Sequence, residues 1–259
     1  MKKPQYLYHY TNIDTLALIL KYKTIRFSRL DLVDDLEEVK TADMGNAGRF
    51  CFASCWTEDD EESIPFWHMY TKDMKGVRIK LPSDPFVKHS VVGKYVTQSF
   101  TSNFTYDQIF RPDGVINSAW GELLTKIIYT EDENLIKPII SYTDSKEYGL
   151  NFGDIGKYKR LNWSFQKEWR YIIFISPLTL EEMQMNKGYL IYERFKSGYN
   201  LDIDHYLLNI DISKFEQMEI TLGPNTSDGE KIIVEALVNK FNPNAKIHDS
   251  KLKNKIKIK

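Results

Sequence analysis

Short segments of alternating apolar and polar residues recur along this chain and limit the folds open to it. In residues 24–30, Ile25 and Phe27 alternate with Arg26 and Ser28, which is typical of a strand with one buried face. Residues 76–81 repeat the pattern. Strand-forming composition predicts further strands at residues 5–9, 50–56, 91–97, 168–175, 189–194, 218–222 and 246–248.

Four segments carry helical signals instead. Thr11 or Asn12 can cap a helix that runs to about residue 21 and buries Leu16, Ile19 and Leu20. A capping box at residues 227–230 predicts a helix to about residue 241. Shorter helices are expected at residues 66–70 and 119–129.

Because strands outnumber helices and most connections are short, we expect an α+β fold with mixed or mostly antiparallel sheets and flanking helices. No internal repeat or low-complexity linker divides the chain, so residues 1–250 are expected to form a single domain. Residues 99–156 give weak signals and have the character of an insertion within it. Residues 251–259 are a lysine-rich tail, either solvated or an edge strand protected by its lysines.

The composition excludes several classes of protein. The net charge of −1 gives no global attraction to duplex DNA or to an anionic membrane. No secretory signal and no membrane-length apolar run is expected. Cys51 and Cys55 lie on one predicted strand, about 13 Å apart, which is too far for a disulfide. We therefore expect reduced thiols and a cytoplasmic location.

Standard catalytic motifs do not occur in the sequence. It contains no Walker loop, no dinucleotide glycine fingerprint and no His-Glu-x-x-His motif. The five histidines are isolated, so no zinc site is predicted and the candidate site is expected to hold no metal.

Candidate residues lie at the ends of predicted strands. His9 and Thr11 end the first strand just before a helix, where they can hold a polar ligand or serve only as a core histidine and a cap. Glu168 and Arg170 point to one side of a later strand, either as an exposed ion pair or as a carboxylate in a cleft whose acidity Arg170 tunes.

Two further groups have both a structural and a functional interpretation. Trp67 and Tyr70 can pack in the core or stack on a ligand ring. Asp34, Asp35 and Glu38 can form a solvated turn or bind a divalent cation.

Taken together, these segments resemble a widespread bacterial and phage-associated family of unknown function over about residues 6–81 and 163–248. The residues that carry the resemblance are Tyr8-His9-Tyr10-Thr11, Ile25-Arg26-Phe27-Ser28, Asp34-Asp35-x-x-Glu38, Phe52-Ala53-Ser54-Cys55-Trp56, Trp67-x-x-Tyr70, Lys75-Gly76-Val77, Glu168-Trp169-Arg170 and Leu222-Gly223-Pro224. The chain departs from the family at Asp34-Asp35-Leu36, where Asn-Asp-Pro is usual, and at Phe52-Ala53-Ser54, where Ser-Phe-Ser is commoner.

That family is distantly similar to ADP-ribosyltransferase folds, which implies a core of two small sheets with NAD, as substrate, bound in the cleft between them. His9 would then hold a ribose hydroxyl, and Thr11 the nicotinamide amide or the ribose. Glu168 would polarise the 2′-hydroxyl and stabilise positive charge as nicotinamide leaves. The catalytic candidates are Glu168 and His9, and the substrate-binding candidates are Tyr10, Thr11, Arg26, Ser28, Trp67, Tyr70 and Arg170.

The resemblance favours an NAD-consuming enzyme, either an ADP-ribosyltransferase or a glycohydrolase, in the role of a toxin or anti-phage effector. The partners of such an enzyme would be a small nucleotide and a protein or nucleic-acid target. No membrane partner is expected. One alternative is a metal-dependent nuclease built on Asp34, Asp35 and Glu38. The other is a module that senses a nucleotide or binds a partner without turnover.

Overall fold

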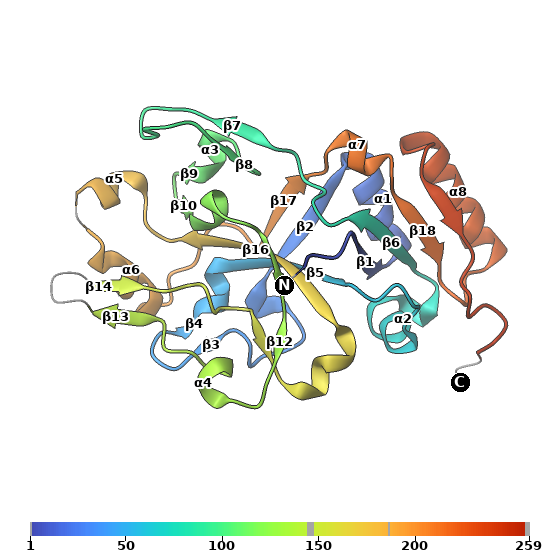
Figure 1. Ribbon diagram of the computed structural model, residues 1–259, viewed down its shortest axis with the longest axis horizontal. Helices are drawn as coiled ribbons and strands as arrows, with labels where there is room; N and C mark the ends of the chain where they lie inside the picture. Colours follow the sequence, from blue (N-terminus) through green and yellow to red (C-terminus); the bar gives the residue numbers. More distant parts are fainter. Residues whose placement is uncertain (1, 144–147, 186, 257–259) are drawn as a thin grey trace.

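A computed structural model describes residues 2–143, 148–185 and 187–256. It has the expected α+β architecture, with mixed but mostly antiparallel sheets and several helices (Figure 1). Among the described residues, no helix combines the length and the apolar character needed to cross a membrane.

A large central sheet contains most of the long strands. Its main path runs through β19 (Lys246–His248), β18 (Glu219–Leu222), β6 (Val77–Pro82), β1 (Tyr6–Thr11), β5 (Cys51–Thr57), β16 (Glu168–Ser176), β10 (Gly114–Ile116) and β9 (Phe110–Arg111). Three strands lie off this path, namely β11 (Leu124–Lys126) beside β16, β2 (Thr24–Arg29) beside β5, and β17 (His205–Asn209) beside β2. Within this sheet, β18 and β19 pair in parallel and the other described pairs are antiparallel.

Helices α1 and α8 pack against each other at one end of the sheet (Figure 1). Helix α1 (Ile13–Tyr22) buries the three expected residues, Leu16, Ile19 and Leu20. Helix α8 (Asp228–Phe241) begins with the predicted capping box, in which Ser227 and Glu230 each bond the other's backbone N–H. Both predicted helices are confirmed.

The remaining helices and small sheets are short. The helices are α2 (Ile64–Tyr70), α3 (Tyr106–Ile109), α4 (Glu133–Ile136), α5 (Leu180–Gln184), α6 (Tyr189–Lys196) and α7 (Ile212–Phe215), and the 3-10 turns include η1 (Leu30–Leu32), η4 (Asn117–Trp120) and η5 (Leu161–Gln166). The two-stranded sheets pair β3 (Lys40–Thr41) with β4 (Gly45–Asn46), β7 (His89–Val91) with β8 (Phe100–Ser102), β12 (Ile128–Tyr129) with β15 (Tyr158–Lys159), and β13 (Ser141–Thr143) with β14 (Tyr148–Leu150).

The segment expected as an insertion supplies part of the central sheet. Strands β10 and β11 pair with β16, and their side chains Val115, Ile116 and Leu124 belong to the same buried cluster as Leu7 of β1. This half of the sheet therefore depends on residues 99–156 for its hydrophobic core.

Three predicted elements are wrong. The helix expected at residues 119–129 is a 3-10 turn followed by strands β11 and β12, because pairing with β16 overrides the helical spacing of Leu123 and Ile127. The strand expected at residues 189–194 is helix α6, whose last carbonyl groups accept hydrogen bonds from the buried Arg49. Of the strand expected at residues 91–97, Val91 is the last residue of β7, and residues 92–97 lie between β7 and β8.

The lysine-rich tail packs on the protein over part of its length. Leu252 and Ile256 contact a second buried cluster, formed by Tyr10, Phe66, Trp67 and Met74. Residues 251–255 form turns rather than an edge strand, and residues 257–259 lie outside the described residues.

Gly76 gives a test of the packing between α2, β1 and β6. A Cβ atom at Gly76 would collide with the carbonyl oxygen of Thr11 and the side chain of Thr71, whereas one at Gly121 would meet no atom within 4 Å. We predict that Gly76→Ala lowers the free energy of unfolding by about 1–3 kcal/mol, measured by urea denaturation. The matched Gly121→Ala variant should unfold like wild type, and equal effects of the two changes would contradict this account of the packing.

Candidate functional site

Strand β5 meets two different strands along one edge. Strand β16 pairs with β5 at every position from Cys51 to Thr57 and occupies its other edge. On the shared edge, β2 pairs with β5 at Phe52 and Ala53, while β1 pairs with it at Thr57. Strands β1 and β2 therefore diverge beside residues 54–56 (Figure 1). We call this divergence the sheet fork.

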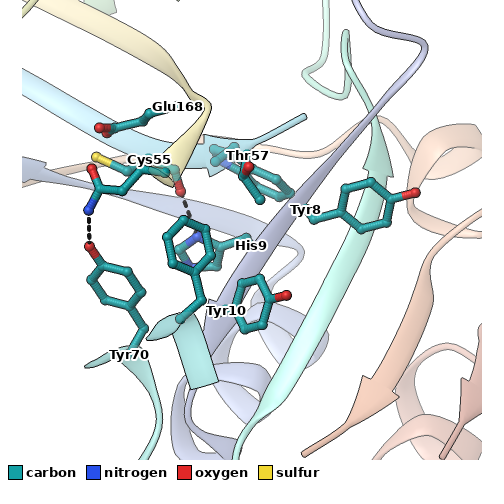
Figure 2. Close-up of a pocket in the computed structure, with 10 residues that line it drawn as sticks. Tyr8, His9, Tyr10, Cys55, Thr57, Tyr70 and Glu168 are labelled. Carbon is teal, nitrogen blue, oxygen red and sulfur yellow. Dashed lines mark hydrogen bonds between the residues drawn. The ribbon is translucent and has the colours of Figure 1, made fainter. Parts of the chain in front are cut away.

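His9 of β1 reaches across the sheet fork. Its Nδ1 lies 2.8 Å from the carbonyl oxygen of Cys55 (Figure 2), and because a carbonyl oxygen only accepts hydrogen bonds, Nδ1 carries the proton. Burial lowers the pKa of His9, so the ring is neutral near pH 7 and its Nε2 is an acceptor. Nε2 makes no hydrogen bond within the described part of the chain, which leaves it for a ligand.

An aromatic pocket opens on one side of His9. It encloses about 390 Å³, including its open mouth. Its lining includes the polar side chains of Thr57, Gln166 and Glu168. Its aromatic walls are Tyr8, Tyr10, Trp56, Phe66 and Tyr70. A flat ring with polar substituents fits this lining.

A charged pocket of about 710 Å³, including its open mouth, adjoins the first. The two pockets share His9, Cys55, Tyr70 and Glu168. The charged pocket is otherwise lined mainly by polar and ionisable side chains, among them Arg26, Ser28, Asp34, Asp35, Glu38, Lys159 and Arg170. The candidates from β1, β2 and β16 thus gather around one hollow at the sheet fork.

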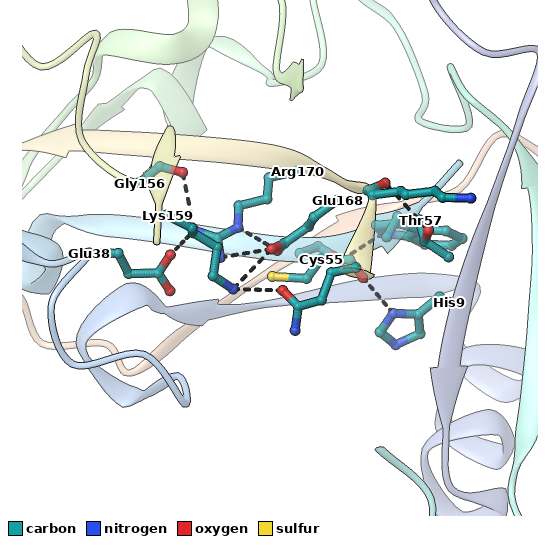
Figure 3. Close-up of polar contacts among 12 residues, drawn as sticks. His9, Glu38, Cys55, Thr57, Gly156, Lys159, Glu168 and Arg170 are labelled. Carbon is teal, nitrogen blue, oxygen red and sulfur yellow. Dashed lines mark hydrogen bonds and ion pairs between the residues drawn. The ribbon is translucent and has the colours of Figure 1, made fainter. Parts of the chain in front are cut away.

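Glu168 and Arg170 lie on the same face of β16, as predicted, but their ion pair is buried rather than exposed. Arg170 Nε donates to one carboxylate oxygen of Glu168 at 2.6 Å, and Lys159 Nζ donates to the other at 3.0 Å (Figure 3). Burial alone would raise the pKa of Glu168, but the charges of Arg170 and Lys159 outweigh it and lower that pKa to about 2. Glu168 is therefore ionised at neutral pH and cannot act there as a proton donor.

Hydrogen bonds connect this ion pair to the aromatic pocket. Lys159 Nζ also donates to Gln166 at 2.8 Å, and the amide of Gln166 donates to the hydroxyl of Tyr70 at 2.7 Å. Burial raises the pKa of Tyr70, so its hydroxyl stays protonated at neutral pH. The orientation of Tyr70 is thus linked to the charge around Glu168.

Three candidate residues have mainly structural surroundings. Trp67 is fully buried, lines neither pocket, and donates its indole N–H to Glu62 at 3.0 Å. Thr11 is buried opposite Val77 on β6 and also lines neither pocket. Tyr10 packs edge-on against Trp67, yet one side of it lines the aromatic pocket.

The acidic turn at residues 34–38 contributes separate carboxylates rather than a joint site. Asp34 is exposed, while the carboxylate of Asp35 accepts a hydrogen bond from the backbone N–H of Glu37. Glu38 turns inward, 2.7 Å from Arg170 Nη1 (Figure 3). Among the described residues, no group of three His, Cys, Asp or Glu side chains could hold a metal ion.

Three residues of the site are not among the candidates predicted from the sequence. Lys159 and Gln166 lie in a short strand and a 3-10 turn, and the chain path from β15 through η5 to β16 brings both to Glu168. Cys55 is a free thiol, as expected, and it also lines both pockets, a role that neither its spacing from Cys51 nor the resemblance assigns to it. Only the tertiary fold shows these positions.

No protein-family model, curated protein or solved structure matches this chain. Any function assigned to it must therefore come from the chemistry of the two pockets. They offer an ionised carboxylate, a neutral imidazole with a free acceptor, and aromatic rings around them.

The pH dependence of stability tests the ion pairs of Glu168. Its pKa of about 2 lies below the ordinary 4.5, so ionised Glu168 stabilises the fold above about pH 4.5, and this contribution is lost as the pH falls towards 2. We predict that Glu168→Gln lowers the free energy of unfolding by about 3–5 kcal/mol at pH 7, because two buried cations lose their partner. The deficit should shrink by about 3 kcal/mol between pH 5 and pH 2, as measured by urea denaturation at each pH.

Glu219 provides the matched control. It begins β18 and pairs with Lys80 at 3.0 Å, but it remains about one-third exposed. Glu219→Gln should cost about 1 kcal/mol or less. A constant deficit for Glu168→Gln from pH 7 to pH 2 would show that its carboxylate is not held by these charges.

Proposed function

We propose that the sheet fork binds NAD as a substrate and that the chain breaks its nicotinamide–ribose bond, as an ADP-ribosyltransferase or glycohydrolase does. One observation carries the proposal: His9 of β1 and Glu168 of β16, far apart in the sequence, line the same two pockets together with Tyr70 (Figure 2). The free thiols of Cys51 and Cys55 fit the reducing, cytoplasmic setting included in the proposal.

Glu168 would act by charge rather than by proton transfer. Cleavage of an N-glycosidic bond builds positive charge on the ribose ring, and a fixed carboxylate stabilises that charge. Arg170 and Lys159 supply three hydrogen bonds to Glu168, out of about four that a carboxylate can accept. The thiol of Cys55 also contacts Glu168, but it is a weak donor that a ribose hydroxyl can replace.

His9 and Tyr70 would position the substrate. The free Nε2 of His9 can accept a hydrogen bond from a ribose hydroxyl, since Nδ1 is already committed to Cys55. The ring of Tyr70 lines both pockets and is held through its hydroxyl by Gln166, so it can stack on the nicotinamide ring with little loss of freedom.

The small contribution of buried ion pairs to folding stability also favours a functional site. A buried ion pair contributes little net stability compared with apolar side chains of similar volume. A cluster of charges beside two pockets is thus better explained by binding or catalysis than by folding.

The test is nicotinamide release from NAD by purified protein, followed by chromatography. We predict that His9→Gln and Glu168→Gln each lower the rate by about 100-fold or more, whereas Glu219→Gln keeps the wild-type rate. If Glu168→Gln folds poorly, the rate of nicotinamide release by His9→Gln still tests the proposal. Wild-type protein that neither binds NAD in calorimetry nor releases nicotinamide, alone or with cell lysate as a source of targets, would reject the proposed function.

A further inference from the structure

The arrangement of the two pockets points to a second substrate. Both contain Glu168, but one is mainly aromatic and the other mainly charged. We infer that the charged pocket is an acceptor subsite, which takes a guanidinium or amine group, and that Glu38 accepts a hydrogen bond from that group. The inference builds on the proposed function and selects transfer to a basic acceptor over hydrolysis by water.

Glu38 is the residue that most needs a ligand. Its side chain is 1% exposed, it lines the charged pocket, and no hydrogen bond from the described residues reaches either carboxylate oxygen. Within the described part of the chain, its ion pair joins Oε2 to Arg170 Nη1 at 2.7 Å without hydrogen-bond geometry. A buried carboxylate without hydrogen bonds is costly, and a ligand with N–H donors would remove that cost.

The charge of the pocket favours a cation. Four carboxylates and three basic side chains line it, and His9 is neutral. Two of the basic groups, Lys159 and Arg170, are already bound by Glu168. Because Arg170 also pairs with Glu38, these four buried charges cancel. On the rest of the lining the carboxylates of Asp34 and Asp35 outnumber the exposed Arg26, so a positively charged group is attracted more strongly than a phosphate.

Arg170 holds the two carboxylates close together. Its guanidinium group contacts Glu168 through Nε at 2.6 Å and Glu38 through Nη1 at 2.7 Å (Figure 3). An acceptor bound to Glu38 would thus lie next to a ribose bound at Glu168. This proximity is what a group transfer between two bound substrates requires.

The proposed transfer accounts for every bond, electron pair and proton involved. The bond between ribose C1′ and the nicotinamide nitrogen breaks, and its electron pair leaves with nicotinamide. A nitrogen of the acceptor supplies the electron pair for the new bond to C1′ and loses one proton, which passes to the carboxylate of Glu38. Burial raises the pKa of Glu38, so it takes up a proton more readily than an exposed glutamate.

Agmatine, a small guanidinium compound, is the probe. Calorimetry without NAD measures its binding, and mass spectrometry with NAD measures the ratio of ADP-ribosyl-agmatine to free ADP-ribose. We predict that Glu38→Gln weakens agmatine binding and lowers the ratio, each by at least about tenfold. The ratio is independent of the fraction of folded protein, so partial unfolding of the variant cannot produce the effect.

Glu37 supplies the control next in sequence. It points outward to Arg160 and Lys137 and lines neither pocket, so Glu37→Gln should behave like wild type in both assays. Absence of agmatine binding to wild type, or an unchanged ratio in Glu38→Gln, overturns the inference. Agmatine binding that depends on Glu38, in a protein that does not consume NAD, supports the cation subsite and rejects the proposed function instead.

Discussion

The two edges of β5 decide the architecture of this protein. Strand β16 occupies one edge over seven residues, so β1 and β2 must share the other, where each pairs with only one end. None of the described strands lies beside the backbone between these ends on that side. Buried carbonyl groups still need partners, and the side chain of His9 provides one for Cys55. A histidine in β1 thus completes the sheet where the ladder is interrupted.

The same interruption creates the site. Because β1 and β2 diverge, side chains from both strands face the gap beside β5, and β16 brings Glu168 and Arg170 to it from the other edge. Lys159 then reaches the carboxylate from outside the sheet. The resulting cluster balances two acidic and two basic side chains, since Arg170 also meets Glu38. Because acidic and basic groups are equal in number, all four side chains can stay ionised although they are buried.

Local sequence patterns predicted the strands and helices that pack against the core through one face. Strands β2 and β6 and helix α8 were found from alternation and a capping box, and α1 from its apolar face. Prediction failed where pairing or capping came from distant residues. Leu124 has helical spacing, yet it pairs with Tyr171 in the sheet, and α6 is capped by Arg49 from far along the chain. Strand β17 was not predicted at all and exists through its pairing with β2.

The family resemblance singled out His9 and Glu168 as catalytic candidates, but residue type and position at strand ends already marked them, and alternation placed Glu168 and Arg170 on one side of a strand. These properties are local, so the sequence alone determined them. Whether the ion pair was exposed or buried, and which cation completed it, depended on Lys159 and on the divergence of β1 from β2. Those are long-range contacts set by strand pairing, and only the tertiary structure could decide them.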